Sequence, residues 1–249
     1  MGRKTPFRGI IQAAAICVLW AAIDLSRASE SSGLTISTTG LAQNLDLPVN
    51  AVGEESSEES VPESVIFYGH SYEATAVVFA LDQSASMRGY SRWEIQVEEV
   101  TKALSSLSED ADFGIVFYND RVTSFREVPL RATEANKLAA LEFVRSQQPR
   151  GQTCLGDGVV KALGIVRQSS NGHQAVLVTS DGRPDYCAGS APTAQDAMRS
   201  VYQQTLNANP ARKVAIHTIY VGTKDEDLAI EFMQGLAQLH GGTFRLCSR

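Results

Sequence analysis

The sequence has few residues of the kinds that form zinc sites or common hydrolase sites. It contains only four cysteines and four histidines, no Cys-x-x-Cys pair occurs, and the histidines share no regular spacing. Zinc sites usually show such clusters, so none is expected, and the histidines are predicted to be structural or exposed. The Gly-x-Ser-x-Gly motif of serine hydrolases is also absent, and no paired general acid and base stands out.

Basic residues are missing from one long stretch of the chain. Between Ala28 and Met87 there is no Lys or Arg, whereas there are nine acidic residues. From Arg88 to Arg249 there are 18 basic and 18 acidic residues, so the formal net charge of −6 does not come from that part. No basic patch of the kind that binds nucleic acid is predicted, and no nucleic-acid partner is expected.

The apolar run near the N-terminus is shorter than a membrane span. Residues 9–23 carry no charge and follow Arg3, Lys4 and Arg8, whereas a spanning helix needs about 20 apolar residues. Ser26-Arg27-Ala28 has the small-x-small pattern of a cleavage site. Residues 1–28 are therefore predicted to be a signal peptide, with an uncleaved N-terminal anchor as the alternative. Either way we expect a secreted or periplasmic protein, or one anchored in the envelope.

Residues 29–63 lack aromatic side chains and any sustained hydrophobic period. They are rich in Ser, Thr and Glu, and such a composition buries too little apolar surface to offset the entropy of ordering. We interpret 29–63 as an acidic flexible linker. In an exported chain the cysteines beyond it meet an oxidising environment, where one disulfide and one remaining thiol are expected from Cys154, Cys187 and Cys247.

From residue 64 onward, strand-like and helix-like segments alternate, and 64–249 is predicted to be one domain. The expected strands are 64–69, 75–82, 113–118, 121–128, 174–181, 213–222 and 243–247. The expected helices are 92–108, 133–147, 156–168, 193–206 and 225–240. This order predicts an α/β fold with three layers, a doubly wound and mostly parallel sheet covered by helices on both faces. Residues 121–128 follow the preceding strand after only two residues, which indicates an antiparallel neighbour.

Oxygen-bearing side chains follow the buried strands. Asp82, Ser84 and Ser86 follow one apolar run, Asp181 stands at the end of another, and Thr153 lies in a turn that opens a helix. Any one of them alone is best explained as a helix cap or a turn residue. Ligands in open α/β sheets bind beyond the carboxyl ends of the strands, however, and the five together indicate a site there.

This five-residue pattern resembles the metal-ion-dependent adhesion site of the von Willebrand factor type A domain. All five positions match in chain order and spacing, and the resemblance extends over 64–249. It implies that the Asp82 and Asp181 strands are adjacent, that one edge strand is antiparallel, and that Mg²⁺ is bound, with Mn²⁺ or Ca²⁺ as alternatives. By analogy, the three hydroxyls contact the metal, and the two carboxylates act largely through water. The strand at 64–69 resembles an addition found in exported bacterial members.

The resemblance implies an exported, metal-dependent protein-binding module that is not an enzyme. Its partner is expected to present an Asp or Glu side chain to the metal. A scaffold whose loops the metal only stabilises is one alternative. The other is a phosphohydrolase with Asp82 as nucleophile, which would want a second carboxylate where the chain has Ser84. Because the Thr153 and Asp181 loops should be neighbours, a Cys154–Cys187 disulfide is expected, with Cys247 as the alternative partner.

Overall fold

The computed structural model describes residues 61–185, 187 and 193–247, and these all belong to one compact unit of the chain. The predicted signal peptide or anchor lies outside the described residues, as does the predicted linker apart from its last three residues.

The elements follow the predicted alternation. The strands are β1 (Glu63–Phe67), β2 (His70–Ala74), β3 (Ala76–Asp82), β4 (Asp112–Tyr118), β5 (Val122–Ser124), β6 (Leu130–Arg131), β7 (Gln174–Ser180), β8 (Ala215–Tyr220) and β9 (Phe244–Leu246). The helices are the 3₁₀ segment η1 (Ala85–Ser91), α1 (Arg92–Ser106), α2 (Glu134–Ser146), α3 (Leu155–Val166), α4 (Ala194–Ala208) and α5 (Asp227–Leu239).

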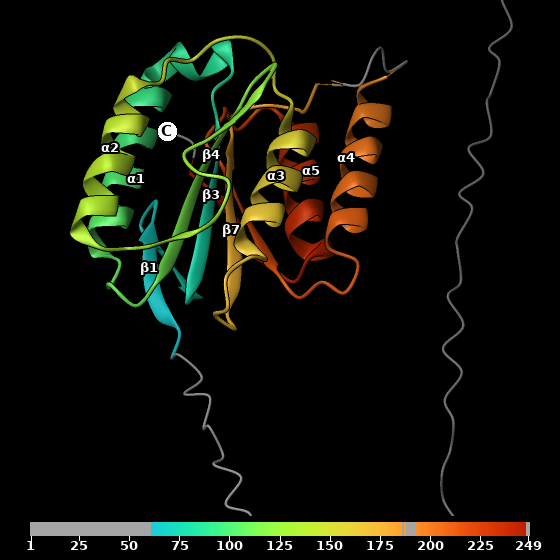
Figure 1. Ribbon diagram of the computed structural model, residues 1–249. Coiled ribbons are helices and arrows are strands. Elements are labelled where there is room, and N and C mark those ends of the chain that lie inside the picture. Colours follow the sequence, from blue (N-terminus) through green and yellow to red (C-terminus); the bar gives the residue numbers. More distant parts are fainter. Residues whose placement is uncertain (1–60, 186, 188–192, 248–249) are drawn as a thin grey trace, which may run out of the picture. The chain divides into compact units, whose positions relative to one another are not determined.

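The main sheet has the predicted doubly wound topology. Its strand order is β5-β4-β3-β7-β8-β9, with β6 also paired to β4. Strands β4, β3, β7, β8 and β9 are parallel, whereas β5 and β6 run antiparallel to β4. Helices α1 and α2 lie on one side of the sheet, and α3, α4 and α5 lie on the other (Figure 1). The three-layer α/β fold with an antiparallel edge strand is therefore confirmed.

The central strand β3 shows why the sheet is buried on both faces. All seven of its residues are buried, and alternate side chains point to opposite faces of a strand. Val77, Phe79 and Leu81 join the apolar cluster that includes residues of α1 and α2. Ala76, Val78 and Ala80 join the cluster that includes residues of α3, α4 and α5. A continuous apolar run is the pattern that such a strand needs.

Two predicted strands differ in the structure. The strand predicted at 64–69 ends at Phe67 and turns through Tyr68 and Gly69, both with positive φ, into a second strand, β2. Strands β1 and β2 form a separate two-stranded sheet. Only Tyr72 and Ala74 are buried in β2, so its sequence carries little hydrophobic signal. The strand predicted at 121–128 is shorter: β5 ends at Ser124, the Phe125 N–H still donates to the Ile115 carbonyl of β4 at 2.9 Å, and the chain pairs with β4 again at β6.

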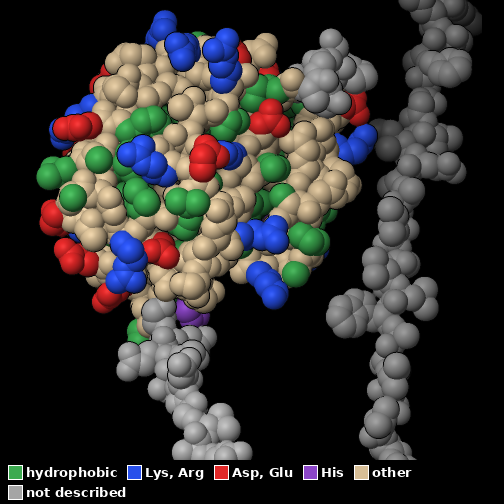
Figure 2. Space-filling view, viewed as in Figure 1, with side chains coloured by type: hydrophobic (Ala, Val, Ile, Leu, Met, Phe, Trp, Pro, Cys, Tyr) green, Lys and Arg blue, Asp and Glu red, His purple; other side chains and the backbone are tan. Residues whose placement is uncertain are grey.

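Charged side chains of both signs are interspersed over the body of the face shown in Figure 2. This distribution agrees with the equal numbers of acidic and basic residues beyond Met87. Within the described residues, no helix has both the length and the apolar composition that crossing a membrane requires.

Candidate metal site at the carboxyl ends of the sheet

The sheet brings the Asp82 and Asp181 loops together. Strands β3 and β7 are parallel neighbours, and Leu81 of β3 pairs in register with Thr179 of β7. Asp82 therefore lies beside Ser180, one residue before Asp181. Strand β4, the next in the chain, lies on the other side of β3. The strand order therefore reverses at β3, with β4 on one side and β7 on the other. A crevice at such a switch point is where open α/β sheets bind ligands.

Hydrogen bonds link four of the five predicted residues. The Ser84 backbone N–H donates to Asp82 Oδ1 at 2.7 Å. The hydroxyls of Ser84 and Ser86 are 3.0 Å apart, and the Ser86 hydroxyl donates to Asp181 Oδ1 at 2.7 Å. Asp82, Ser84 and Asp181 are buried, whereas Ser86 is exposed. Oxygen atoms of four residues thus form one continuous group with a single solvent-facing member.

Further polar residues hold Asp82 in place. The Ser180 hydroxyl donates to Asp82 Oδ2 at 2.8 Å, and the Gln96 side chain donates to the Asp82 carbonyl at 2.9 Å. The sequence reasoning missed both residues. A signal for Ser180 was available, because it directly precedes Asp181 at the strand end. None was available for Gln96, which lies on α1 and becomes buried only when the helix packs on the sheet.

The Asp82 carboxyl lies in an environment that opposes its negative charge. Burial raises its pKa to about 7, and the nearby Asp181 carboxylate adds to the rise. Hydrogen bonds from Ser84 and Ser180 counter the shift only in part. A cation next to two buried carboxylates would reverse this penalty, because an opposite charge favours the ionised form.

Arg92 forms an ion pair at the edge of this group. Its Nη1 lies 2.5 Å from Asp181 Oδ2, and both side chains are largely buried. The guanidinium also lies over the Tyr90 ring, 5.0 Å from the centroid. Arg92 is the first residue of α1, where the helix dipole disfavours a cation. The sequence analysis did not identify Arg92, because its pairing with Asp181 arises only when α1 packs beside the end of β7.

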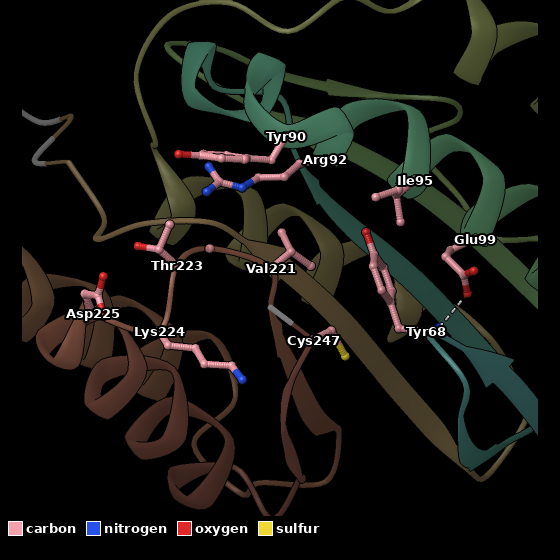
Figure 3. Close-up of a pocket in the computed structure, with 11 residues that line it drawn as sticks. Tyr68, Tyr90, Arg92, Ile95, Glu99, Val221, Thr223, Lys224, Asp225 and Cys247 are labelled. Atoms are coloured by element: carbon pink, nitrogen blue, oxygen red, sulfur yellow. Dashed lines mark hydrogen bonds between the residues drawn. The ribbon is translucent and has the colours of Figure 1, made fainter. Parts of the chain in front are cut away.

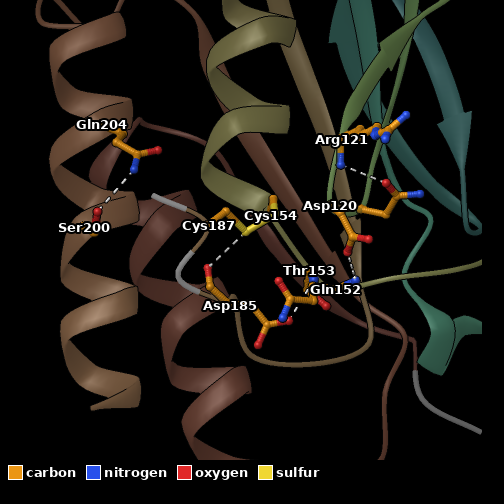
Figure 4. Close-up of a disulfide and its surroundings, with 10 residues drawn as sticks. Asp120, Arg121, Gln152, Thr153, Cys154, Asp185, Cys187, Ser200 and Gln204 are labelled. Atoms are coloured by element: carbon orange, nitrogen blue, oxygen red, sulfur yellow. Dashed lines mark hydrogen bonds between the residues drawn. A yellow bond between two sulfur atoms is a disulfide. The ribbon is translucent and has the colours of Figure 1, made fainter. Parts of the chain in front are cut away.

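Thr153, the fifth predicted residue, lies on an adjoining loop that is held to the Asp181 loop. The Thr153 N–H donates to Asp185 Oδ2 at 2.8 Å, and the Asp185 N–H donates to the Thr153 carbonyl at 2.9 Å. A disulfide joins Cys154 to Cys187, with Cα atoms 5.6 Å apart (Figure 4). The predicted pairing is confirmed, and Cys247 is the free cysteine of the described residues. Asp185, which matches no ligand position of the pattern, instead positions Thr153.

A backbone hydrogen bond joins the Thr153 loop to the Asp82–Ser86 loop. The Ala85 N–H donates to the Gly151 carbonyl at 3.1 Å. Within the described part of the chain, no hydrogen bond links the Thr153 hydroxyl to the side chains of the other four predicted residues. The structure therefore brings four of these residues into direct contact and places the fifth on the next loop.

The group opens onto a cleft of about 730 Å³, and its lining includes Ser86, Asp181, Arg183, Asp185 and Glu226. The five predicted residues offer oxygen donors only, three hydroxyls and two carboxylates. Hard cations such as Mg²⁺ prefer this donor chemistry. The described residues contain no group of three or more His, Cys, Asp and Glu arranged to hold a metal, so a site here relies on hydroxyls as well as carboxylates. The residues present fit a hard divalent cation.

Comparison with known proteins agrees with this fold. Residues 77–183 match the family model of the von Willebrand factor type A domain. Inter-alpha-trypsin inhibitor heavy chain H2 of Mesocricetus auratus is 22% identical over 206 residues, which are 74% of this chain and 20% of that protein. The chain thus spans about a fifth of the length of that relative.

Two solved structures are similar in fold. The von Willebrand factor type A protein from Catenulispora acidiphila has a TM-score of 0.57 and 19% sequence identity, over 71% of this chain and 39% of that one. The pilus adhesin SpaC from Lactobacillus rhamnosus GG has a TM-score of 0.57 and 13% identity, over 76% of this chain and 29% of that one.

Proposed function

We propose that this chain, which contains a von Willebrand factor type A domain, is an exported protein-binding module that uses a divalent cation, Mg²⁺, to bind an acidic side chain of its partner. The observation that carries the proposal is the hydrogen-bonded group formed by Asp82, Ser84, Ser86 and Asp181 at the switch point of the sheet. The only cation that the described residues place in this group, Arg92, pairs with Asp181, and the buried Asp82 carboxyl keeps a pKa raised to about 7.

The chain's own residues divide the work of holding the ion. The hydroxyls of Ser84, Ser86 and Thr153 are the proposed direct ligands. Asp82 and Asp181 orient them and accept hydrogen bonds from bound water. When bound, Mg²⁺ supplies positive charge with coordination positions left for oxygen atoms from outside the chain. The exposed Ser86 lies on the cleft, where an acidic side chain from a partner can approach.

Two observations support export. Disulfides such as Cys154–Cys187 form and persist chiefly in oxidising compartments. One of the similar structures is a pilus adhesin, a protein of the bacterial exterior. Both agree with the signal peptide or anchor proposed for residues 1–28.

The alternatives of a scaffold and a hydrolase receive less support. The disulfide and the paired hydrogen bonds between Thr153 and Asp185 already hold two of the loops, so a metal is not needed to shape them. A phosphohydrolase with Asp82 as nucleophile needs a second carboxylate nearby, and Ser84 occupies that place. Asp82 is also fully buried and bonded to two neighbours, which disfavours attack on a substrate.

The experiment is capture of partners from the native envelope fraction on the immobilised full chain in Mg²⁺, followed by elution with EDTA. The wild type should retain a protein that EDTA releases, and Asp82→Ala should retain none while remaining folded by circular dichroism. Asp157→Ala is the control, because that acid lies in the first turn of α3 and matches no ligand position. Undiminished capture in excess EDTA would count against the proposal.

A further inference from the structure

A second cavity lies between α1, the β1–β2 turn and the loop after β8, and it shares Arg92 and Thr223 with the lining of the cleft at the candidate metal centre. It has a volume of about 580 Å³, within the range of small-molecule sites. Its walls are shown in Figure 3, and its lining residues include Tyr68, Ile95, Val221, Lys224 and Cys247. The lining thus combines aromatic and aliphatic side chains with four charged ones, Arg92, Glu99, Lys224 and Asp225.

The Tyr68 hydroxyl is the first polar group that indicates a ligand-binding site. It is buried and has no hydrogen-bond partner among the described residues, although burying a hydroxyl without a partner is costly. The residue is held firmly, because its backbone N–H donates to Glu99 Oε2 at 2.9 Å. Its φ is +51°, in a turn where Gly or Asn would be favoured. A tyrosine at this position therefore has two unfavourable features, and a bound acceptor would offset the one that concerns the hydroxyl.

The charged groups of the wall leave one cation available. The Arg92 guanidinium already bonds to Asp181, and Glu99 bonds to the Tyr68 N–H and to Lys102. Lys224 has no ion pair or hydrogen bond within the described part of the chain. In Figure 3 its side chain extends toward Cys247, whereas Asp225, which also lines the cavity, lies at the left edge of the view.

We propose that this cavity binds a small amphipathic anion. An aromatic or aliphatic body would pack against Ile95, Val221 and the Tyr68 ring. An acceptor atom of the ligand would accept a hydrogen bond from the Tyr68 hydroxyl, and the negative group of the ligand would lie near Lys224. Neither group belongs to the candidate metal centre, so this binding does not depend on the proposed function.

The test uses 8-anilino-1-naphthalenesulfonate, an aromatic anion whose fluorescence rises on binding. The full chain should bind one equivalent saturably, and Tyr68→Phe should weaken binding on the order of tenfold, the equivalent of one hydrogen bond. The same change removes an unpartnered hydroxyl, so its melting temperature should stay equal or rise. Lower affinity without lower stability is a result that a merely structural role would not give.

Tyr72→Phe is the matched control. The Tyr72 hydroxyl is also buried, with the Arg245 side chain beside it, but Tyr72 does not line the cavity. Its change to Phe should leave the dye affinity unchanged. Lys224→Gln should weaken binding several-fold, whereas Lys213→Gln, at an exposed position outside the cavity, should not.

Cys247 gives an independent footprint. Its thiol lies on the cavity wall, so saturating dye should slow its alkylation by N-ethylmaleimide at least several-fold, followed by peptide mass spectrometry. Added EDTA should change neither the affinity nor the protection, which separates this site from the metal centre. Equal affinities for wild type, Tyr68→Phe and Lys224→Gln, or an unprotected Cys247 at saturation, would overturn the proposal.

Discussion

Asp82 carries opposite consequences for stability and for metal binding. It is fully buried, and it accepts hydrogen bonds from the Ser84 N–H and the Ser180 hydroxyl. Its pKa in the fold is raised to about 7 from the usual 3.8, chiefly by burial and then by Asp181. Its ionised form therefore destabilises the metal-free fold, and the same negative charge attracts a cation. Functional sites commonly retain such unfavourable groups.

The first prediction concerns the pH dependence of the metal-free chain. Between about pH 4 and pH 7 the unfolded chain ionises Asp82 while the fold keeps the proton, so this contribution to stability is lost as pH rises through that window. In the wild type the free energy of unfolding should therefore decrease by ~2–4 kcal/mol as pH rises, and Asp82→Asn should abolish this decrease. Urea unfolding in EDTA at pH 5 and pH 7.5 measures it. If the free energy of unfolding depended on pH in the same way for wild type and variant, the pKa of Asp82 would not be raised in the fold.

His217 should produce a slope of the opposite sign. Burial, and then Arg245, lowers its pKa from 6.5 to about 4, and its Nδ1 accepts a hydrogen bond from the Thr243 N–H at 3.1 Å. Below pH 6.5 the unfolded chain takes up a proton that the fold refuses, so stability falls as pH drops toward 4. In chains that carry Asp82→Asn, the free energy of unfolding should decrease by up to ~3 kcal/mol as pH falls, and His217→Asn should abolish most of this decrease. Urea unfolding from pH 7 to pH 4.5 measures this decrease. The same pH dependence with and without His217→Asn would contradict the prediction.

At this scale the sequence identified the ligand candidates better than the residues that support them. Asp82, Ser84, Ser86 and Asp181 were predictable because strand ends in a parallel sheet converge at one edge. The role of Arg92 depends on how α1 packs against the β7 end, and local sequence does not contain that information.

At the scale of elements, the two loops that carry Thr153 and Asp181 act as one unit. Two hydrogen bonds join Thr153 and Asp185, one from the Thr153 N–H to the Asp185 carboxylate and one between the two backbones, and they lie next to the Cys154–Cys187 disulfide. The disulfide closes a segment with a sequence separation of 33 residues. We expect the pair of constraints to hold Thr153 near the other proposed ligands before any ion binds, which reduces the entropic cost of binding.

The third prediction tests this clamp. Cys154→Ser/Cys187→Ser should lower the free energy of unfolding by about 3–4 kcal/mol, the loop-closure value for such a separation. Mg²⁺ affinity should fall several-fold, because the Thr153 loop must then be ordered on binding. Asp185→Ala should lower affinity in the same direction with a smaller stability loss. Calorimetric titration and urea unfolding measure both, with Cys247→Ser as the control. Full Mg²⁺ affinity without the disulfide would contradict preorganisation.

The elements themselves were predictable in proportion to their hydrophobic signal. Strands β3 and β7 are recognisable as continuous apolar runs, because helices cover both faces of the sheet and nearly every residue of these strands is buried. Strand β2 was missed because it buries only Tyr72 and Ala74 and gains its pairing through a two-residue turn. The predicted length of 121–128 was wrong at its end because β5 is exposed at the edge, where pairing with β4 and not burial decides its limits.

At the scale of the whole domain, the two faces of the sheet are covered by different means. One is covered by helices α3, α4 and α5 alone, and the other by α1, α2 and the β1–β2 hairpin. The hairpin packs Phe67 against Phe79 of the central strand and Tyr72 against His217 of β8. This arrangement leaves the 580 Å³ cavity beside α1 and the 730 Å³ cleft above the strand ends. The central claim concerns the cleft, where charge and geometry converge.

The most direct test is isothermal titration of the metal-free chain with Mg²⁺ at pH 7.5, with Ser84→Ala/Ser86→Ala as the matched variant. The account predicts one saturable site in the wild type, with a melting temperature that rises as the site fills. It predicts no binding heat and no thermal shift in the double variant, whose circular dichroism spectrum should match that of the wild type. A wild type that binds neither Mg²⁺ nor Mn²⁺ at millimolar concentration would contradict the account, as would a double variant that binds as tightly as the wild type.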